Sequence, residues 1–392
     1  MRAILFLLVL LTVSYAAGFG QARQILERTW IVTNNGSFDF TASMIVNNSN
    51  QQIFSIKTEP EMTVTSNENG QFWLNYSGEG VAILRATIVV DVDYDPKIIY
   101  DAQVPKNNIN FTNLTLPDEK IIFRTEKLVN DSSLITIYNI VDWVHNYVTY
   151  DLTYWDKTKS AQEVFVERRG VCVEYSHLLL SMLGAAGFEA RYVSGYVYTT
   201  AWQPHAWVEI YLPEYGWVAA DPTFNQIGTL DSSHIAIAYG PDQSYIYDSI
   251  STWDYNATLS LKDDIRTNFE NADPKGIEMK IFFENDIVTF EITNTRPYYT
   301  YGTYGSSMAN VQDSQLLLIN PSSRMNITRS FDESIFNDEF VYTVPVIAWF
   351  NDAQTNKTFQ IAVNDEEGVS EATPQCLPMF LLASLFLFAI KQ

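Results

Sequence analysis

The stretch "GVCVEYSHLLLSMLGAAGF", residues 170–188, contains Cys172, one of two cysteines in this chain of 392 residues. Apolar residues recur at helical spacing after Cys172 and Gly187 is a typical helix end, so the stretch predicts a helix that begins near the cysteine. The positive dipole end of a helix stabilises a thiolate, the reactive form of cysteine. Cys172 is therefore a candidate nucleophile that requires a nearby base.

The sequence on either side of this helix predicts an α+β unit over residues 119–242. Before it, a helical pattern follows a Ser132 N-cap, and a second helix begins with the capping box Ser160/Glu163 and is expected to stop at Gly170. After it come three β-type runs, "ARYVSGYVY", "HAWVEIYL" and "GWVAADPT". Helices followed by consecutive strands favour a domain with an antiparallel sheet.

The flanks of this unit are predicted to be β-rich. Residues 27–118 and 276–366 contain short alternating runs separated by turn-forming residues, so each is expected to be a β-sandwich-like domain. Residues 243–275 are polar and weakly patterned, and we expect them to connect the central unit to the second β domain. Residues 367–375 form a polar stalk.

Both ends of the chain predict export. Residues 1–17 resemble a signal peptide, with an uncleaved anchor as the alternative. Residues 376–392 contain an apolar run that would span about 21 Å as a helix, against about 30 Å for a bilayer core, so they are expected to be a short membrane anchor or a processed sorting tail. N-glycosylation sequons support an extracellular, cell-surface glycoprotein. They begin at Asn35, Asn47, Asn75, Asn110, Asn113, Asn130, Asn256, Asn326 and Asn356.

Composition excludes several function classes. The formal net charge of −22 leaves no basic field to collect phosphates, so we expect no nucleic-acid partner. The sequence has no zinc-type spacing of Cys and His, no EF-hand loop and no GxSxG elbow, so we expect no metal, no cofactor and no serine nucleophile. The expected partners are a protein or peptide substrate and, through the C-terminal segment, the membrane.

Among the four histidines, His205 is the best candidate base. His145 lies beside core positions of an earlier helix, and His177 is turned away from Cys172 around its own helix. His205 opens the run "HAWVEIYL" and Asp221 ends the next run, so a hairpin would bring them to one end of the sheet. Cys, His and Asp would then supply nucleophile, base and orienting group. From the residues alone, a buried core cysteine remains the alternative.

The hairpin gives this idea a geometric condition. Opposite residues of an antiparallel hairpin have numbers with a constant sum, and His205 and Asp221 share a face only if that sum is even. A four-residue loop over Pro213–Gly216 would place them on opposite faces. A five-residue loop or one bulge would place them on the same face, about 7–8 Å apart if the sum is 428. We therefore predict an odd-length loop or a bulge.

Three stretches together resemble the core of the transglutaminase-like superfamily, most of all its secreted bacterial and archaeal branch: "ERRGVCVEYSHLLLSMLGAAGFEARYVSGY", "HAWVEIYLPEYGWVAADPT" and "HIAIAYGPD". The resemblance implies a papain-like fold over roughly residues 130–242. It also implies that Cys172 is the nucleophile, His205 the base and Asp221 the orienting group. His234, in the third stretch, lies outside that triad. The oxyanion stabiliser of the family is often an upstream side chain, for which Trp155 or Tyr154 is a candidate.

The resemblance implies an extracellular thiol enzyme that attacks amide bonds and forms a thioester. Release of the thioester by water would make it a cysteine peptidase or amidase, the favoured alternative. Release by a primary amine would make it a protein-glutamine gamma-glutamyltransferase, which crosslinks proteins. Because some family members have lost the triad, a non-enzymatic adhesion or assembly protein is the third alternative, although the complete set of three residues weighs against it.

Overall fold

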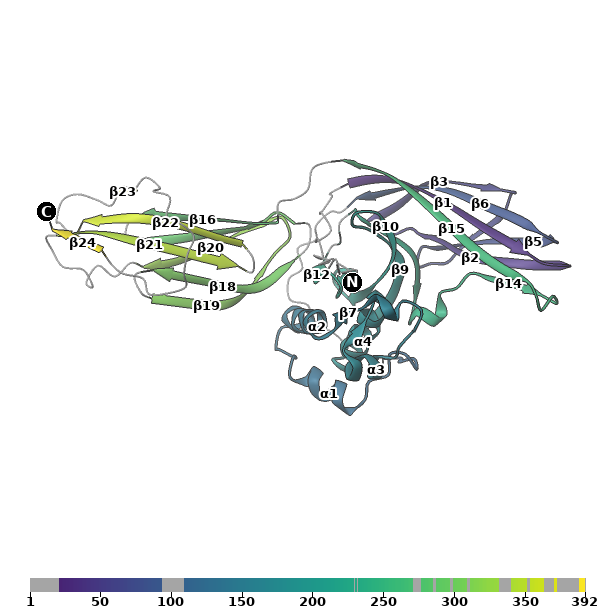
Figure 1. Cartoon of the computed structure of the whole chain (residues 1–392), viewed down its shortest axis with the longest axis horizontal. Helices are drawn as coiled ribbons and strands as arrows, with labels where there is room; N and C mark the ends of the chain where they lie inside the picture. Colours follow the sequence, from purple (N-terminus) through teal and green to yellow (C-terminus); the bar gives the residue numbers. More distant parts are fainter. Residues whose placement is uncertain are drawn as a thin grey trace, which may run out of the picture. The chain divides into compact units, whose positions relative to one another are not determined.

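A computed structural model describes most of the chain, in two compact units. One unit comprises residues up to 95 together with 100–273, and the other comprises residues 96–99 together with those from 274 onward. Figure 1 shows helices α1–α4 in the first unit and strands from β16 onward in the second. The described residues are 21–93, 109–228, 230, 232–270, 276–284, 287–296, 299–308, 311–330, 340–350, 353–362, 370–371 and 388–391.

Two four-stranded antiparallel sheets form the N-terminal part of the first unit. Apolar side chains from both sheets, among them Trp30, Phe40 and Ile88, gather in one hydrophobic core. In spatial order, one sheet comprises β15 (Thr258–Glu270), β1 (Gln21–Thr33), β6 (Ala82–Asp93) and β3 (Gln51–Glu59), and the other comprises β14 (Ser249–Thr252), β2 (Ser37–Val46), β5 (Gln71–Glu79) and β4 (Thr63–Ser66).

The prediction of a connector over residues 243–275 is wrong, because two strands in this segment return to the N-terminal sheets. β15 pairs with β1 along its whole length, from Gln21 opposite Glu270 to Thr33 opposite Thr258, and β14 pairs with β2. β15 is an edge strand whose described side chains alternate between exposed and half-buried. Since no side chain on it is fully buried in this stretch, it lacks the apolar run by which a strand is recognised in a sequence.

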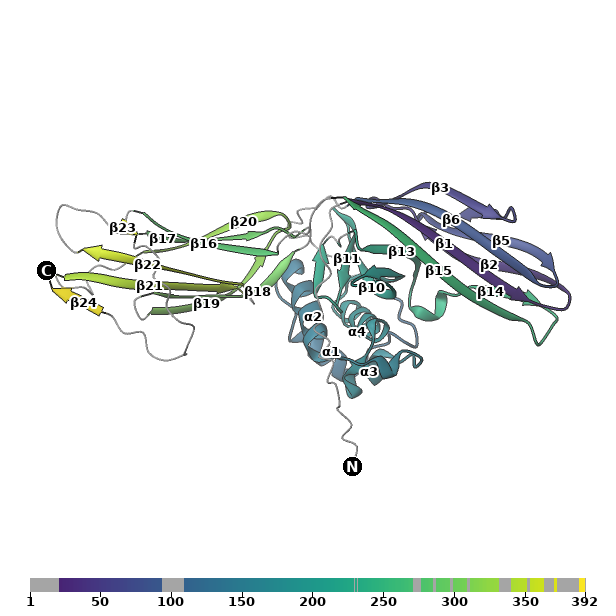
Figure 2. The same ribbon diagram turned by 45° about the horizontal axis from the view of Figure 1, so that its top comes forward.

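A helical layer and a five-stranded antiparallel sheet follow in chain order, as the sequence predicted. Figure 2 shows helices α1–α4 grouped on one side of this sheet, and α4 contacts both β9 and β10. The helices are α1 (Glu119–Glu126), α2 (Ser133–Tyr147), α3 (Ala161–Glu167) and α4 (Cys172–Ala185). The sheet has the order β12 (Gln226–Gly228), β11 (Gly216–Asp221), β10 (Trp202–Leu212), β9 (Ala190–Tyr198) and β13 (His234–Gly240).

The predicted helix caps are confirmed, but the predicted role of Gly170 is wrong. Ser132 caps α2, and Ser160 with Glu163 forms the capping box of α3. α3 ends at Glu167, three residues before Gly170, which belongs to the short strand β8 (Arg169–Gly170). A Cβ atom at residue 170 would lie 2.2 Å from the Cβ of Glu174. Glycine is therefore required because the Glu174 side chain lies over the backbone there.

Strand β13 joins the five-stranded sheet to the N-terminal sheets. Ile235 and Ile237 of β13 belong to the same hydrophobic core as the strands of those sheets. The side-chain amide of Gln51 donates to the carbonyls of Val46 and Ala236, at 2.7 and 2.8 Å, and accepts from the N–H of Ala236 at 2.9 Å. The position of β13 is therefore set by the N-terminal sheets as well as by its own sheet.

The second unit consists of two antiparallel sheets around a core that includes Phe290, Tyr304 and Phe350. This agrees with the prediction of β structure over residues 276–366. One sheet comprises β16 (Ile277–Glu284), β17 (Ile287–Asn294) and β20 (Ser323–Ser330), and the other comprises β18 (Thr300–Met308), β19 (Val311–Ile319), β21 (Phe340–Phe350), β22 (Ala353–Ala362), β23 (Ser370–Glu371) and β24 (Phe388–Lys391).

Most residues of the predicted signal peptide, stalk and anchor lie outside the described residues. The described part of the anchor, Phe388–Lys391, forms β24 and pairs with β21 instead of ending a helix. Alternating Phe388 and Ile390 suit a strand. None of the helices in the described part of the chain is long and apolar enough to cross a membrane. Export and anchoring stay predictions.

Candidate active site

The hairpin of β10 and β11 places His205 and Asp221 on one face. Val208 pairs with Ala220 and Leu212 with Gly216, so paired numbers add up to 428, the even sum that the triad requires. The loop, residues 213–215, has odd length as predicted, although it is shorter than the five residues considered. Gly216 follows it with φ 73°, a left-handed conformation that glycine adopts without strain.

His205 and Asp221 form a buried, directly bonded pair. The Nε2 of His205 lies 2.7 Å from Oδ2 of Asp221, and the two side chains are 4% and 0% exposed. The other carboxylate oxygen, Oδ1, accepts from the backbone N–H groups of Thr223 at 2.8 Å and Phe224 at 3.3 Å. The turn after β11 therefore holds the carboxylate on one side while the imidazole holds it on the other.

Cys172 completes the set on the neighbouring helix. It is the first residue of α4, carries a free thiol and is 7% exposed. Because Nε2 of His205 bonds to Asp221, Nδ1 is the ring nitrogen left to face the thiol, and Cys172 contributes to the raised pKa of His205. The structure thus brings together the three residues that the sequence predicted as nucleophile, base and orienting group.

The electrostatics of the pair favour an imidazolium beside a carboxylate. Burial lowers the pKa of His205, but the charge and hydrogen bond of Asp221, and then those of Cys172, raise that pKa to about 10. Burial alone would raise the pKa of Asp221, whereas the neighbouring His205 brings it well below its usual range. At neutral pH His205 is therefore charged and can donate a proton from Nδ1.

Glu174 fixes the start of the nucleophile helix, and its role was missed from the sequence. One carboxylate oxygen accepts from the N–H of Val171 at 2.9 Å, and the other accepts from the N–H of Lys159 at 3.1 Å. Burial raises the pKa of Glu174 despite these bonds. Glu174 thereby ties the residue before Cys172 to the segment that precedes α3, and it uses the space that Gly170 leaves open.

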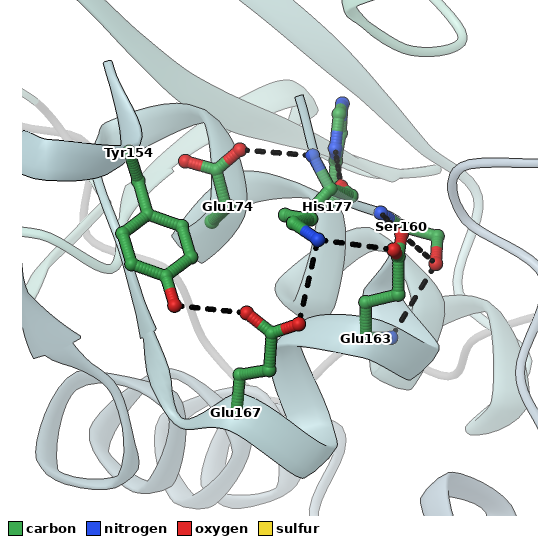
Figure 3. Close-up of polar contacts among 7 residues, drawn as sticks. Tyr154, Ser160, Glu163, Glu167, Glu174 and His177 are labelled. Carbon is green, nitrogen blue, oxygen red and sulfur yellow. Dashed lines mark hydrogen bonds and ion pairs between the residues drawn. The ribbon is translucent and has the colours of Figure 1, made fainter. Parts of the chain in front are cut away.

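A polar network anchors that segment to α4 (Figure 3). His177 of α4 donates from Nδ1 to the carbonyl of Lys159 at 2.8 Å. The ammonium of Lys159 lies 3.2 Å from Glu163 and 3.4 Å from Glu167 of α3. The hydroxyl of Tyr154 donates to Glu167 at 2.9 Å, so this hydroxyl is engaged by α3. Tyr154 is therefore a poor candidate for an oxyanion stabiliser.

Of Tyr150 and the predicted Trp155, Tyr150 is the residue whose pKa is affected by Cys172 in the described part of the chain. Trp155 is 77% exposed, and no interaction within the described residues joins its indole to Cys172. Tyr150 belongs to β7 (Thr149–Tyr150), pairs with Gly170 just before the helix, and has its ring 6.2 Å from that of Tyr175 on α4. Burial, and next the charge of Cys172, raises the pKa of Tyr150 well above its usual range. Its hydroxyl therefore stays protonated within electrostatic range of the sulfur.

Comparison with known proteins identifies this region. Residues 125–222 match the family model of the transglutaminase-like superfamily. The chain contains a transglutaminase-like domain. A solved structure from Cytophaga hutchinsonii, provisionally named a cysteine protease, superposes on it with a TM-score of 0.50 at 21% identity and covers 64% of this chain and 92% of that one. This likeness shows a shared fold.

Sequence relatives share only part of their length with the chain. Over 97 residues it is 31% identical to a protein-glutamine gamma-glutamyltransferase of Pseudomonas aeruginosa, which covers 22% of this chain and 14% of that protein. Over 144 residues it is 30% identical to an uncharacterised protein of Mycobacterium tuberculosis, covering 33% and 39%. The chain thus spans well under half the length of these relatives.

His234 adds a second imidazole to the transglutaminase-like site, just beyond the matched residues. Its Nε2 lies 3.4 Å from Oδ2 of Asp221, the same oxygen that binds His205. Donor atoms of the three residues lie within 4.8 Å of one another, as in a metal site. However, two ligands of a tetrahedral zinc are about 3.3 Å apart, and the 2.7 Å between His205 and Asp221 is a hydrogen-bond distance. The arrangement fits a hydrogen-bonded chain better than a metal centre.

Proposed function

We propose that the chain is a thiol enzyme that breaks amide bonds of proteins or peptides through Cys172, His205 and Asp221. The observation that carries the proposal is the buried His205–Asp221 pair at 2.7 Å, next to a thiol at the start of a helix. A buried core cysteine would need neither a charged imidazole at its side nor a buried carboxylate behind that imidazole.

The reaction follows from these positions. The thiolate of Cys172 attacks the amide carbonyl carbon and forms a C–S bond, while the carbonyl oxygen becomes an oxyanion. His205 donates its proton to the leaving nitrogen, the C–N bond breaks, and a thioester remains. A water molecule then attacks the thioester and passes a proton to His205, and the C–S bond breaks to regenerate the thiolate. Such general acid–base help contributes about 10²–10⁴ in rate.

Two groups are our candidates for stabilising the oxyanion. Cys172 is the first residue of α4, so its backbone N–H has no acceptor within the helix. The hydroxyl of Tyr150 is the second group in our proposal, in place of the indole of Trp155. An N–H and an O–H on either side of the carbonyl oxygen would stabilise negative charge as it develops.

Tyr150→Phe should therefore lower kcat about 10- to 100-fold with little change in KM, because the hydroxyl acts on charge that appears only during the reaction. Trp155→Phe is the matched comparison and should cost less than Tyr150→Phe. Steady-state kinetics on both variants measure this. The opposite order of effects would return the oxyanion role to Trp155.

Hydrolysis is the favoured reaction, and amine transfer is the alternative. The name of the Pseudomonas aeruginosa relative, a protein-glutamine gamma-glutamyltransferase, supports transfer to an amine. Both reactions share the thioester and differ only in the nucleophile that releases it.

Incubation of the full-length protein with casein and a dansylated primary amine distinguishes the alternatives. Hydrolysis releases ammonia or new peptide termini and leaves casein unlabelled, whereas transfer attaches the fluorophore to casein. Either product should disappear in Cys172→Ala. If the wild-type protein gives neither product, the result contradicts the enzymatic proposal and favours a non-enzymatic adhesion or assembly protein.

A further inference from the structure

We propose that His234 is a positioning residue of the site, which acts through Asp221 by holding the carboxylate in the orientation that serves His205. This inference rests on the proposed function of the triad, and it adds a fourth member from β13. His234 lies outside the sequence motif that ends at Asp221.

The carboxylate of Asp221 is held from both sides. Oδ1 accepts two backbone N–H groups from the turn after β11, and Oδ2 faces Nε2 of His205 at 2.7 Å and Nε2 of His234 at 3.4 Å. Since a carboxylate only accepts, each imidazole carries the proton on its Nε2. Without His234, Oδ2 would have His205 as its single donor, and rotation of the carboxylate about the Cβ–Cγ bond would be less restricted on that side.

The surroundings of His234 fix its ring. The side chain is 0% exposed, and Nδ1 lies 3.4 Å from the Ser233 hydroxyl. Trp207 stacks near His205 at 6.0 Å between ring centroids, and it meets His234 edge-on at 5.4 Å. Gly195, between the two strands, allows this, because a Cβ there would lie 2.7 Å from the Trp207 ring. A single indole therefore keeps both imidazoles in place.

Another buried polar side chain next to Asp221 does not serve this purpose. Gln226 is the cross-strand partner of Asp221, and its side-chain amide is buried without a hydrogen bond in the described part of the chain. Gln226 on β12 therefore does not bind Oδ2 of Asp221, and His234 on β13 is the second donor to this oxygen. Because Gln51 and the N-terminal core position β13, these sheets support the chemistry of a site to which they contribute no side chain.

The test compares two amide replacements and one apolar one. His234→Gln places an N–H close to the position of Nε2, whereas the shorter His234→Asn does not, and His234→Leu removes the donor. We expect alkylation of Cys172 by iodoacetamide at pH 7 to slow about 10- to 100-fold in the Leu and Asn variants and to stay near the wild-type rate in the Gln variant. In casein turnover the loss should fall on kcat and leave KM within about twofold.

A double-mutant cycle with Asp221→Asn completes the test. If His234 acts only through Asp221, adding His234→Leu to Asp221→Asn should cost little more than Asp221→Asn alone. Losses that multiply would overturn the inference, as would wild-type rates in folded His234→Asn. An Asp221→Asn protein that alkylates as fast as the wild type would instead refute the triad and with it the proposed function. Thermal melting of each variant confirms that folded protein is compared.

Discussion

Cys172→Ala should abolish amide cleavage, with a loss of about 10⁴-fold or more in kcat/KM. The thiol is the atom that forms the covalent intermediate, and it is the free cysteine of the described residues. No other group at the site can replace it, because the hydroxyl of Tyr150 stays protonated. His205→Ala should cost a similar factor. Removing both should cost hardly more than removing one, since nucleophile and base act as a unit.

The control for this prediction is Cys172→Ser, which keeps the size of the buried side chain and should melt close to the wild type. Serine keeps the geometry, but its hydroxyl is a far weaker nucleophile at neutral pH unless an adjacent base removes its proton. Casein turnover and thermal melting should be measured on the same preparations. Turnover in Cys172→Ala above a hundredth of the wild-type rate would contradict the assignment of the nucleophile.

Local patterns explain the part of the site that the sequence predicted. The start of α4, the caps at Ser132 and Ser160 and the parity of the hairpin each depend on residues close together in the chain. A hairpin with a short loop has few possible registers, and the requirement that His205 and Asp221 share a face selects among them. Helix order and strand order followed from the same local reasoning.

Long-range pairing explains what the sequence did not predict. β15 pairs with β1 although most of the first unit's sequence lies between the two strands, and neither strand shows in its own residues where its partner lies. The contact of Gln51 with β13 also joins distant segments. His234 reaches Asp221 although β10 and β9 lie between β11 and β13 in the sheet, so nothing in the local sequence indicates this contact. Strand order of this kind depends on the whole fold and not on any motif.

Side-chain roles near the thiol were missed for a different reason. Gly170 looked like a helix stop, because glycine after a helical pattern usually ends it. Its actual function depends on the carboxylate of Glu174, which turns back over the chain to reach Val171. Glu174, an acidic residue at the third position of α4, fits half of a capping box. The other half is missing, because Val171 at the N-cap has no side-chain acceptor for a backbone N–H. Tyr150 gave no local signal at all.

Asp221→Asn should lower kcat about 10²- to 10⁴-fold and leave the fold intact. The amide matches the carboxylate in size, so the backbone bonds from Thr223 and Phe224 can persist. However, the amide carries no charge to stabilise the imidazolium of His205, and it can present an N–H where the ring needs an acceptor. The same change should not alter KM greatly, because Asp221 is 0% exposed and does not reach a substrate.

The pH dependence of activity and stability tests the role of Asp221 most directly. The pKa of His205 is raised from 6.5 to about 10, so the ion pair stabilises the fold fully below pH about 6.5 and this contribution is lost as the pH rises through about 10. Activity that needs the imidazolium should fall on the alkaline side over the same range.

In Asp221→Asn the alkaline limb of the pH–rate profile should move down toward the ordinary histidine pKa of about 6.5, because burial then lowers the pKa of His205 without a carboxylate to oppose it. A pH–rate profile of both proteins between pH 5 and about 10.5, with melting temperatures at each pH, measures both effects. An unchanged alkaline limb in the variant would mean that Asp221 does not hold the proton on His205, and the orienting role would have to be withdrawn.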